Sequence, residues 1–159
     1  QGSLQAQMAI NQAVHFTDWV IGHSHLAMLG FVTFAATGGI AHAWQRIPWA
    51  RYNRRAMTWS YWLLVTGVLL MVPHLTLAGI TEARLWQSGA PWIESVRAAQ
   101  IHWLVRVLSA IPLFAGFIAF LIGLTTGPRG AGLAEIETSI GLEPVEHVSP
   151  KMIEAAEAS

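Results

Sequence analysis

The sequence predicts an all-α membrane protein with three transmembrane helices. Three observations predict this class: 53% of the 159 residues are hydrophobic, only 11% are charged, and the apolar residues gather in three long runs. A soluble domain usually carries about 25% charged residues. The formal net charge is zero, so composition indicates no nucleic-acid partner. Because cysteine is absent, disulfides and thiolate metal sites within this chain are excluded.

The three runs cover residues 19–44, 57–80 and 101–126. Each reaches the roughly 20 residues that an α-helix needs to cross the hydrocarbon core of a bilayer. The predicted organisation is therefore an outer segment at 1–18, a three-helix transmembrane region at 19–126 and a glutamate-rich acidic tail at 127–159. We assign no chemistry to the tail.

The basic residues predict the orientation of these helices. Arg46, Arg51, Arg54 and Arg55 crowd the loop after the first span. The predicted loop between the second and third spans mixes both signs of charge: Glu82, Arg84, Glu94 and Arg97. By the positive-inside rule the first loop and the C-terminal tail are cytoplasmic, and the N-terminus lies outside. Tryptophans, which favour membrane interfaces, form an outer and an inner group: Trp19, Trp86, Trp92 and Trp103, then Trp44, Trp49, Trp59 and Trp62.

The first and third spans carry rows of small residues, such as Ala115, Ala119 and Gly123. Such rows allow helices to approach closely. Three helices cannot bury many such faces among themselves. The chain also begins at Gln1 without the basic flank of a signal peptide. We therefore expect a processed, split or truncated chain that packs against further helices.

Two histidines, His23 and His25, lie inside the first span. A histidine there is costly unless it is paired, hydrogen-bonded or bound to metal. Residues two apart on an α-helix point about 200° apart, so an unbroken helix cannot present both rings to one metal ion. Each ring can serve a separate centre, and neutral imidazole is a good ligand for haem iron. Hydrogen bonds to neighbouring helices are the alternative, and spacing alone leaves both interpretations open.

The surrounding residues extend this interpretation. Residues 15–25 read His-Phe-Thr-Asp-Trp-Val-Ile-Gly-His-Ser-His, and Leu-Gly-Phe follows at 29–31. This stretch resembles the tenth helix of the catalytic subunit of haem–copper oxidases, in particular the cbb(3)-type cytochrome c oxidases with their Thr-Asp-Trp-x-x-Gly-His-x-His pattern. Weaker similarity to that subunit's last two helices continues at 78–80, 85–86, 92–98 and 105–106. Together the resemblance covers roughly residues 10–126.

The resemblance implies two b-type haems at this helix, and a copper ion bound by residues outside the chain. It implies that His23 is the catalytic proximal ligand of the high-spin haem iron and that His25 is an axial ligand of the low-spin haem iron. It places His15 close to the haem propionates, where Asp18 would join it in a propionate or cation site. Thr17 and Asp18 are equally good ordinary helix caps.

Arg106 lies inside the third span, near its outer end. A buried arginine needs an anionic partner, for which a haem propionate, Glu94 or a carboxylate on another subunit would serve. Snorkelling to the interface is the alternative. We interpret His74 as a hydrogen-bonded packing residue and place His102 at the interface.

The implied function is part of the catalytic subunit of a terminal respiratory oxidase in a bacterial inner membrane. Such an enzyme reduces O2 to water with electrons from a c-type cytochrome, coupled to proton translocation. The family's copper ligands, cross-linked tyrosine and second axial haem ligand have no counterpart in this sequence, so other oxidase helices or subunits must supply them. A nitric oxide reductase-type subunit, which would take NO, and a non-catalytic haem-binding membrane subunit are the alternatives.

Overall fold

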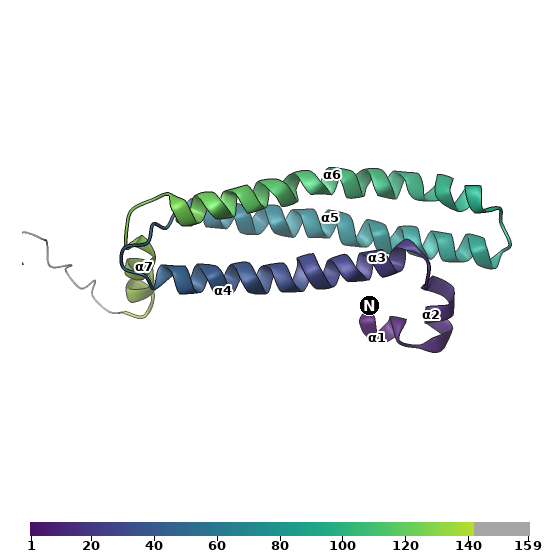
Figure 1. Ribbon diagram of the computed structural model, residues 1–159, viewed down its shortest axis with the longest axis horizontal. Helices are drawn as coiled ribbons and strands as arrows, with labels where there is room; N and C mark the ends of the chain where they lie inside the picture. The colour runs from purple at the N-terminus through teal and green to yellow at the C-terminus, as the bar shows by residue number, and fades with distance from the viewer. Residues whose placement is uncertain (142–159) are drawn as a thin grey trace, which may run out of the picture.

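The computed structural model describes residues 1–141, and the regular elements of that part are helices (Figure 1). The first span comprises α3 (Asp18–His25), a π-helical segment (Leu26–Val32) and α4 (Thr33–Gln45), which follow one another without a break. The second and third spans are α5 (Arg54–Gln87) and α6 (Trp92–Thr125). All three are long and apolar enough to cross a membrane, which confirms the predicted fold class.

The second and third helices are longer than the apolar runs that predicted them. Asn53 caps α5 by accepting a hydrogen bond from the backbone N–H of Ala56 at 3.2 Å, and the helix begins at Arg54, three residues before the predicted start. Helical backbone hydrogen bonds do not require apolar side chains, so a helix can continue into the polar layers beyond the hydrocarbon. Each of these helices has 34 residues, more than a bilayer core requires.

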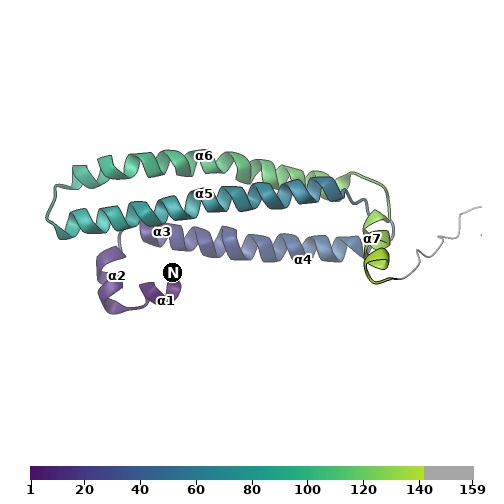
Figure 2. The ribbon, with the colours of Figure 1, turned by 180° about the vertical axis from the view of Figure 1, so that it is seen from behind.

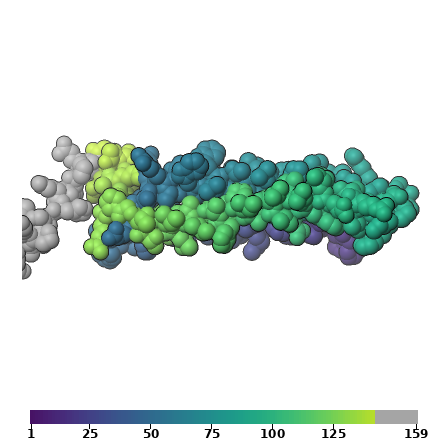
Figure 3. All heavy atoms as spheres, turned by 90° about the horizontal axis from the view of Figure 1, so that it is seen from above, coloured from purple at the N-terminus to yellow at the C-terminus, as the bar shows by residue number. Residues whose placement is uncertain are grey.

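The three spans lie nearly parallel, with α5 between the first span and α6 (Figures 1 and 2). From above, α6 covers much of the visible face and the first span lies largely behind it (Figure 3). Small residues bring α5 and α6 together: a Cβ built on Gly67 would lie 2.5 Å from Leu113, and one on Gly116 would lie 2.9 Å from Leu64. The buried apolar cluster at this contact contains Leu64, Val68, Met71, Val72, Leu75 and Leu113.

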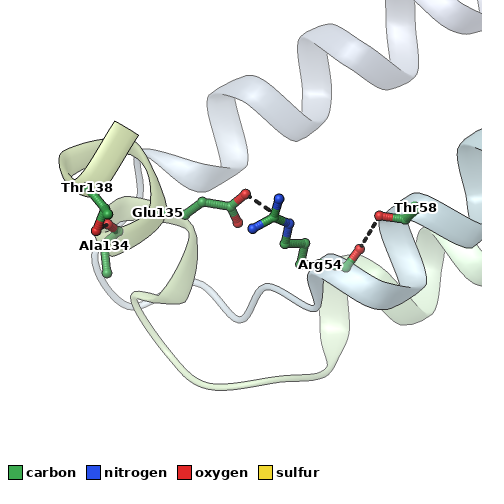
Figure 4. A network of polar contacts seen from close by, with 5 residues as sticks. All are labelled: Arg54, Thr58, Ala134, Glu135 and Thr138. Carbon is green, nitrogen blue, oxygen red and sulfur yellow. Dashed lines mark hydrogen bonds and ion pairs between the residues drawn. The ribbon is translucent and has the colours of Figure 1, made fainter. Parts of the chain in front are cut away.

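Short helices lie at both ends of the bundle. Near the start of α3 are α1 (Gly2–Gln5) and α2 (Met8–Val14), and near the end of α4 is α7 (Ala131–Ser139) (Figure 1). An ion pair of 3.3 Å between Arg54 and Glu135 ties α7 to the start of α5 (Figure 4). The predicted acidic tail thus begins with a helix, and its residues 142–159 lie outside the described part.

The first span leaves most of its apolar surface uncovered by the described chain. No residue in its apolar window is buried, whereas 44% of the corresponding window of α5 is buried. A Cβ added at Gly38 or Gly39 would meet nothing within 4 Å. Lipid or further helices can occupy this face, and its packing against further helices stays a prediction.

Candidate functional site

The helix that carries the two histidines begins at a well-formed cap. The Thr17 side chain accepts a hydrogen bond from the backbone N–H of Trp19 at 3.3 Å, and its hydroxyl donates to the carbonyl of Val14 at 2.7 Å. The predicted capping role of Thr17 is confirmed. This geometry fixes where α3 starts, and therefore where the histidines at its far end lie.

Asp18 connects all three spans. Its backbone N–H donates to Glu82 Oε2 on α5 at 2.8 Å, and its carboxylate accepts a hydrogen bond from Trp103 Nε1 on α6. Both Asp18 and Glu82 are buried. Buried polar groups are rarely left without hydrogen bonds, and bonds to charged groups are stronger than neutral ones. The start of α3 is therefore held by polar contacts to both other spans.

Glycines let α3 lie directly against α5 below this cap. A Cβ built on Gly79 would lie 2.1 Å from the backbone nitrogen of Trp19, and one on Gly22 would lie 3.1 Å from the Leu75 side chain. The Gly79 contact leaves no space for any side chain. These two contacts set the distance between α5 and the turn that precedes His23.

The His23 ring forms no hydrogen bond within the described part of the chain. Its Nδ1 is buried and unbonded, and the ring lies near the backbone of α1, where a Cβ on Gly2 would come within 3.3 Å of Cε1 and 3.6 Å of Nε2. The ring also borders an apolar cavity of about 440 Å³. The cavity is lined by His23, Leu26, Ala27, Gly30, Phe31, Phe34, Val65, Val68 and Leu69.

His25 is oriented by its own helix. Its Nδ1 lies 2.8 Å from the carbonyl oxygen of Ile21, and because a carbonyl only accepts, Nδ1 is the protonated nitrogen. In the neutral ring Nε2 then carries a free lone pair, the tautomer that a metal-binding imidazole uses. Since α3 is regular through both residues, the rings of His23 and His25 leave the helix about 200° apart.

The helix changes its winding directly after His25. Residues Leu26–Val32 form a π-helical segment, and the Thr33 hydroxyl donates to the carbonyl of Met28, five residues earlier, at 3.0 Å. Single π-turns inside α-helices are rare and frequent at functional sites. Hydropathy patterns carry no signal for this segment, and the sequence did not predict it.

Both imidazoles fit haem iron by their chemistry. His23 has a buried nitrogen without a partner, and His25 has a free Nε2 opposite a fixed Nδ1–H. The cavity beside His23 is mainly apolar and includes two phenylalanines, as expected of a site for a flat macrocycle. Because α1 lies against the Cε1–Nε2 edge of His23, a ligand on Nε2 requires α1 or the ring to move.

The other predicted site residues lie apart from these two rings. His15 is exposed and its Nδ1 lies 3.3 Å from Asn11 Oδ1 on α2, rather than bonding to Asp18. Arg106 is exposed on α6, and it does not pair with Glu94, although both residues belong to the described part of that helix. The His15 and Arg106 side chains are both exposed, and their predicted contacts with haem propionates stay predictions.

Two polar contacts were missed by sequence reasoning. Glu82 was expected in a loop, but it lies buried within α5 and accepts from Asp18. The prediction of a hydrogen bond for His74 is confirmed, but its partner is His102 on α6, with 3.1 Å between the two Nδ1 atoms. Only the relative placement of α5 and α6 brings these residues together, so no local pattern could have identified the pair.

Comparisons with known proteins find relatives among cytochrome c oxidase subunits. A cytochrome c oxidase subunit 1 homologue from Bradyrhizobium diazoefficiens is 25% identical, over 92% of this chain and 28% of that protein. One from Azorhizobium caulinodans is 27% identical, over 86% and 28%. The cbb3-type cytochrome c oxidase subunit CcoN1 of Stutzerimonas stutzeri is 24% identical, over 87% and 31%.

The chain thus spans less than a third of the length of these relatives. The model of the family described as cytochrome C and quinol oxidase polypeptide I matches residues 1–112, which include the whole first span and both histidines. That match covers well over half of the 159 residues. The chain therefore belongs to the cytochrome c and quinol oxidase polypeptide I family.

Proposed function

We propose that this chain is part of the catalytic subunit of a terminal respiratory oxidase and holds two b-type haems from opposite faces of one helix. His23 would bind the high-spin haem iron and His25 the low-spin haem iron. The observation that carries the proposal is the pair of imidazoles on opposite sides of α3: His25 has its Nδ1–H bonded and its Nε2 lone pair free, and the buried Nδ1 of His23 has no hydrogen-bond partner. Family membership supports this choice over isolated structural histidines.

Haem would supply the electron transfer and oxygen chemistry, and the chain's own residues would supply position. The Nδ1–H of His25 donates to the carbonyl of Ile21, which fixes the ring and its tautomer. The hydrogen bond from Trp103 to the carboxylate of Asp18 and the close contact at Gly79 hold the start of α3, about one turn before His23. The helix backbone then keeps both rings at a fixed separation.

The full reaction that we propose is reduction of O2 to water with electrons from a c-type cytochrome, coupled to proton translocation. It requires further helices or subunits that carry the copper ion and the remaining haem ligands. The unburied apolar face of the first span supports an assembly with such helices. In the same proposal His15 and Arg106, both exposed, contact haem propionates, and Asp18 holds α3 in place for them.

We also propose that the chain lies in a bacterial inner membrane with its N-terminus outside. The four arginines between the first and second spans support a cytoplasmic position for that loop. The relatives from Bradyrhizobium and Stutzerimonas are bacterial proteins, which supports the compartment.

Substitution of single histidines in the assembled enzyme tests the proposal. His25→Ala should remove the low-spin signal from the reduced-minus-oxidised spectrum, while His23→Ala should abolish turnover and keep most of that signal. His42→Ala is the matched control, because His42 is an exposed histidine at the other end of the same span. Normal activity and spectra in both ligand variants would show that the ligand assignment is wrong.

The assembled enzyme also separates the two alternatives. Consumption of O2 without NO reduction supports the oxidase, whereas NO reduction would identify a nitric oxide reductase-type subunit. Intact haem spectra with no turnover of either gas would identify a non-catalytic haem-binding subunit. The spectrum of this chain expressed alone tests whether haem binding depends on partner helices or subunits. A normal low-spin spectrum without partners would contradict that dependence.

A further inference from the structure

Two arginines are held side by side where α4 ends, α5 begins and α6 ends. Arg51, in the loop after α4, and Arg129, in the loop after α6, form an isolated antiparallel bridge. The bridge is closed on both sides by Tyr52 N–H to the Pro128 carbonyl at 3.4 Å and by Gly130 N–H to the Ala50 carbonyl at 3.0 Å. Arg51 and Arg129 are thus the non-hydrogen-bonded pair, the type in which facing side chains lie closest.

This arrangement is electrostatically unfavourable without a counter-charge. Like charges directly opposite each other in an antiparallel pair destabilise it. Arg51 Nη1 donates to the carbonyl of Gly127 at 3.3 Å, a neutral acceptor that removes no charge. The ion pair found among residues 1–141 joins Arg54 to Glu135 and involves neither of these arginines (Figure 4). An anion between the two guanidinium groups would relieve their repulsion.

The two arginines border a cavity of about 380 Å³ whose other walls are mainly apolar. Trp44 forms part of it, and its Nε1 donates to the carbonyls of Arg51 at 2.9 Å and Leu124 at 3.1 Å, which fixes the indole between the loop after α4 and the end of α6. Trp49 is 75% exposed. The complete lining is Trp44, Ile47, Trp49, Ala50, Arg51, Leu124, Thr125 and Arg129.

The position of the cavity restricts its occupant. It lies where the apolar helices α4 and α6 end, at Gln45 and Thr125, and therefore at the boundary between hydrocarbon and water. A ligand there can place an anionic group between the arginines and apolar chains along Ile47 and Leu124. Exposed tryptophan is favoured at the same depth. A soluble anion would use the two charges but not the apolar wall.

We propose that this cavity binds one anionic phospholipid, with its phosphate held between the guanidinium groups of Arg51 and Arg129. Guanidinium binds phosphate oxygens in a bidentate manner, and basic pockets between transmembrane helices bind anionic headgroups. The site lies at the opposite end of the bundle from α3, the helix that carries His23 and His25 (Figure 1). Its existence does not depend on haem binding.

Lipid retention by the full chain tests the proposal. The protein is equilibrated with phosphatidylcholine bilayers containing phosphatidylglycerol, extracted gently, and its retained lipids are counted by native mass spectrometry. We expect retention of phosphatidylglycerol over phosphatidylcholine, with a loss on the order of fivefold for each arginine replaced. Arg51→Gln with Arg129→Gln should abolish the preference. Arg84→Gln with Arg97→Gln, two exposed arginines near the end of α5 and the start of α6, should preserve it.

Further variants separate charge, folding and ligand source. Arg51→Lys with Arg129→Lys keeps the charge without the bidentate fork and should retain an intermediate preference. Circular dichroism of both double variants tests for misfolding, because we expect the helical content of each to equal that of the wild type. Phosphatidylglycerol retained by the glutamine pair, or equal retention of both lipids by the wild type, would overturn the proposal. Displacement of the lipid by millimolar inorganic phosphate would likewise indicate a site for a free anion.

Discussion

Replacing Gly79 by alanine should displace the histidine-bearing helix from α5. The added Cβ would lie 2.1 Å from the backbone nitrogen of Trp19 and 2.6 Å from its Cα, whereas ordinary van der Waals contact begins at 3.4 Å. The nearest contact must therefore lengthen by about 1.3 Å. Backbone atoms cannot rotate away as the end of a flexible side chain can, so α3 as a whole must move.

Two other glycines provide a graded scale for this change. At Gly123 the added Cβ would meet Met57 Sδ at 2.8 Å, a flexible side chain that can adjust, and at Gly38 it would meet nothing within 4 Å. Overpacking a close contact costs about 1–3 kcal/mol. We expect Gly79→Ala near the upper end of that range, about 3 kcal/mol, and Gly123→Ala near 1 kcal/mol. Gly38→Ala should be neutral or stabilise by up to about 1 kcal/mol through helix propensity.

Equilibrium unfolding in mixed micelles, followed by helical circular dichroism, measures the three free energies. The same variants in the assembled enzyme should show a perturbed haem spectrum for Gly79→Ala alone, because His23 and His25 follow Trp19 within two turns. A Gly79→Ala variant as stable as Gly123→Ala, with an unchanged spectrum, would refute the close contact between α3 and α5.

Two further predictions concern polar groups. Trp103→Phe removes the hydrogen bond to the buried carboxylate of Asp18 and should lower the free energy of unfolding by about 1.5–3 kcal/mol. A double-mutant cycle with Asp18→Asn should give a coupling energy between the two residues. Strictly additive changes in the free energy of unfolding would contradict the hydrogen bond. Burial raises the pKa of Tyr52, in the loop between α4 and α5, above its ordinary 10.0. Its stabilising contribution is complete below about pH 10 and is lost as pH rises through the raised pKa. Unfolding measured against pH should therefore show a shallower alkaline decline for Tyr52→Phe than for the wild type, and equal slopes would exclude Tyr52 as the group responsible.

The sequence predicted what depends on composition along the chain, namely the three spans and the capping residue Thr17. Helix ends were less predictable, because a helix continues for as long as its backbone is hydrogen-bonded. Glu82 therefore lies inside α5 rather than in a loop. The pairing of His74 with His102 and the contact of Trp103 with Asp18 depend on how α5 and α6 are aligned, which no local pattern encodes.

The polar contacts that join the first span to the other two spans lie near its two ends. At one end the Asp18 carboxylate accepts from Trp103, and at the other Trp44 Nε1 donates to the carbonyls of Arg51 and Leu124. Between these ties none of its apolar window is buried. Hydrophobic burial drives helix association weakly within lipid, so hydrogen bonds and close packing determine where such a helix lies. Loss of either tie should therefore displace the span, and Asp18, nearer to His23, should affect the two imidazoles more than Trp44 does.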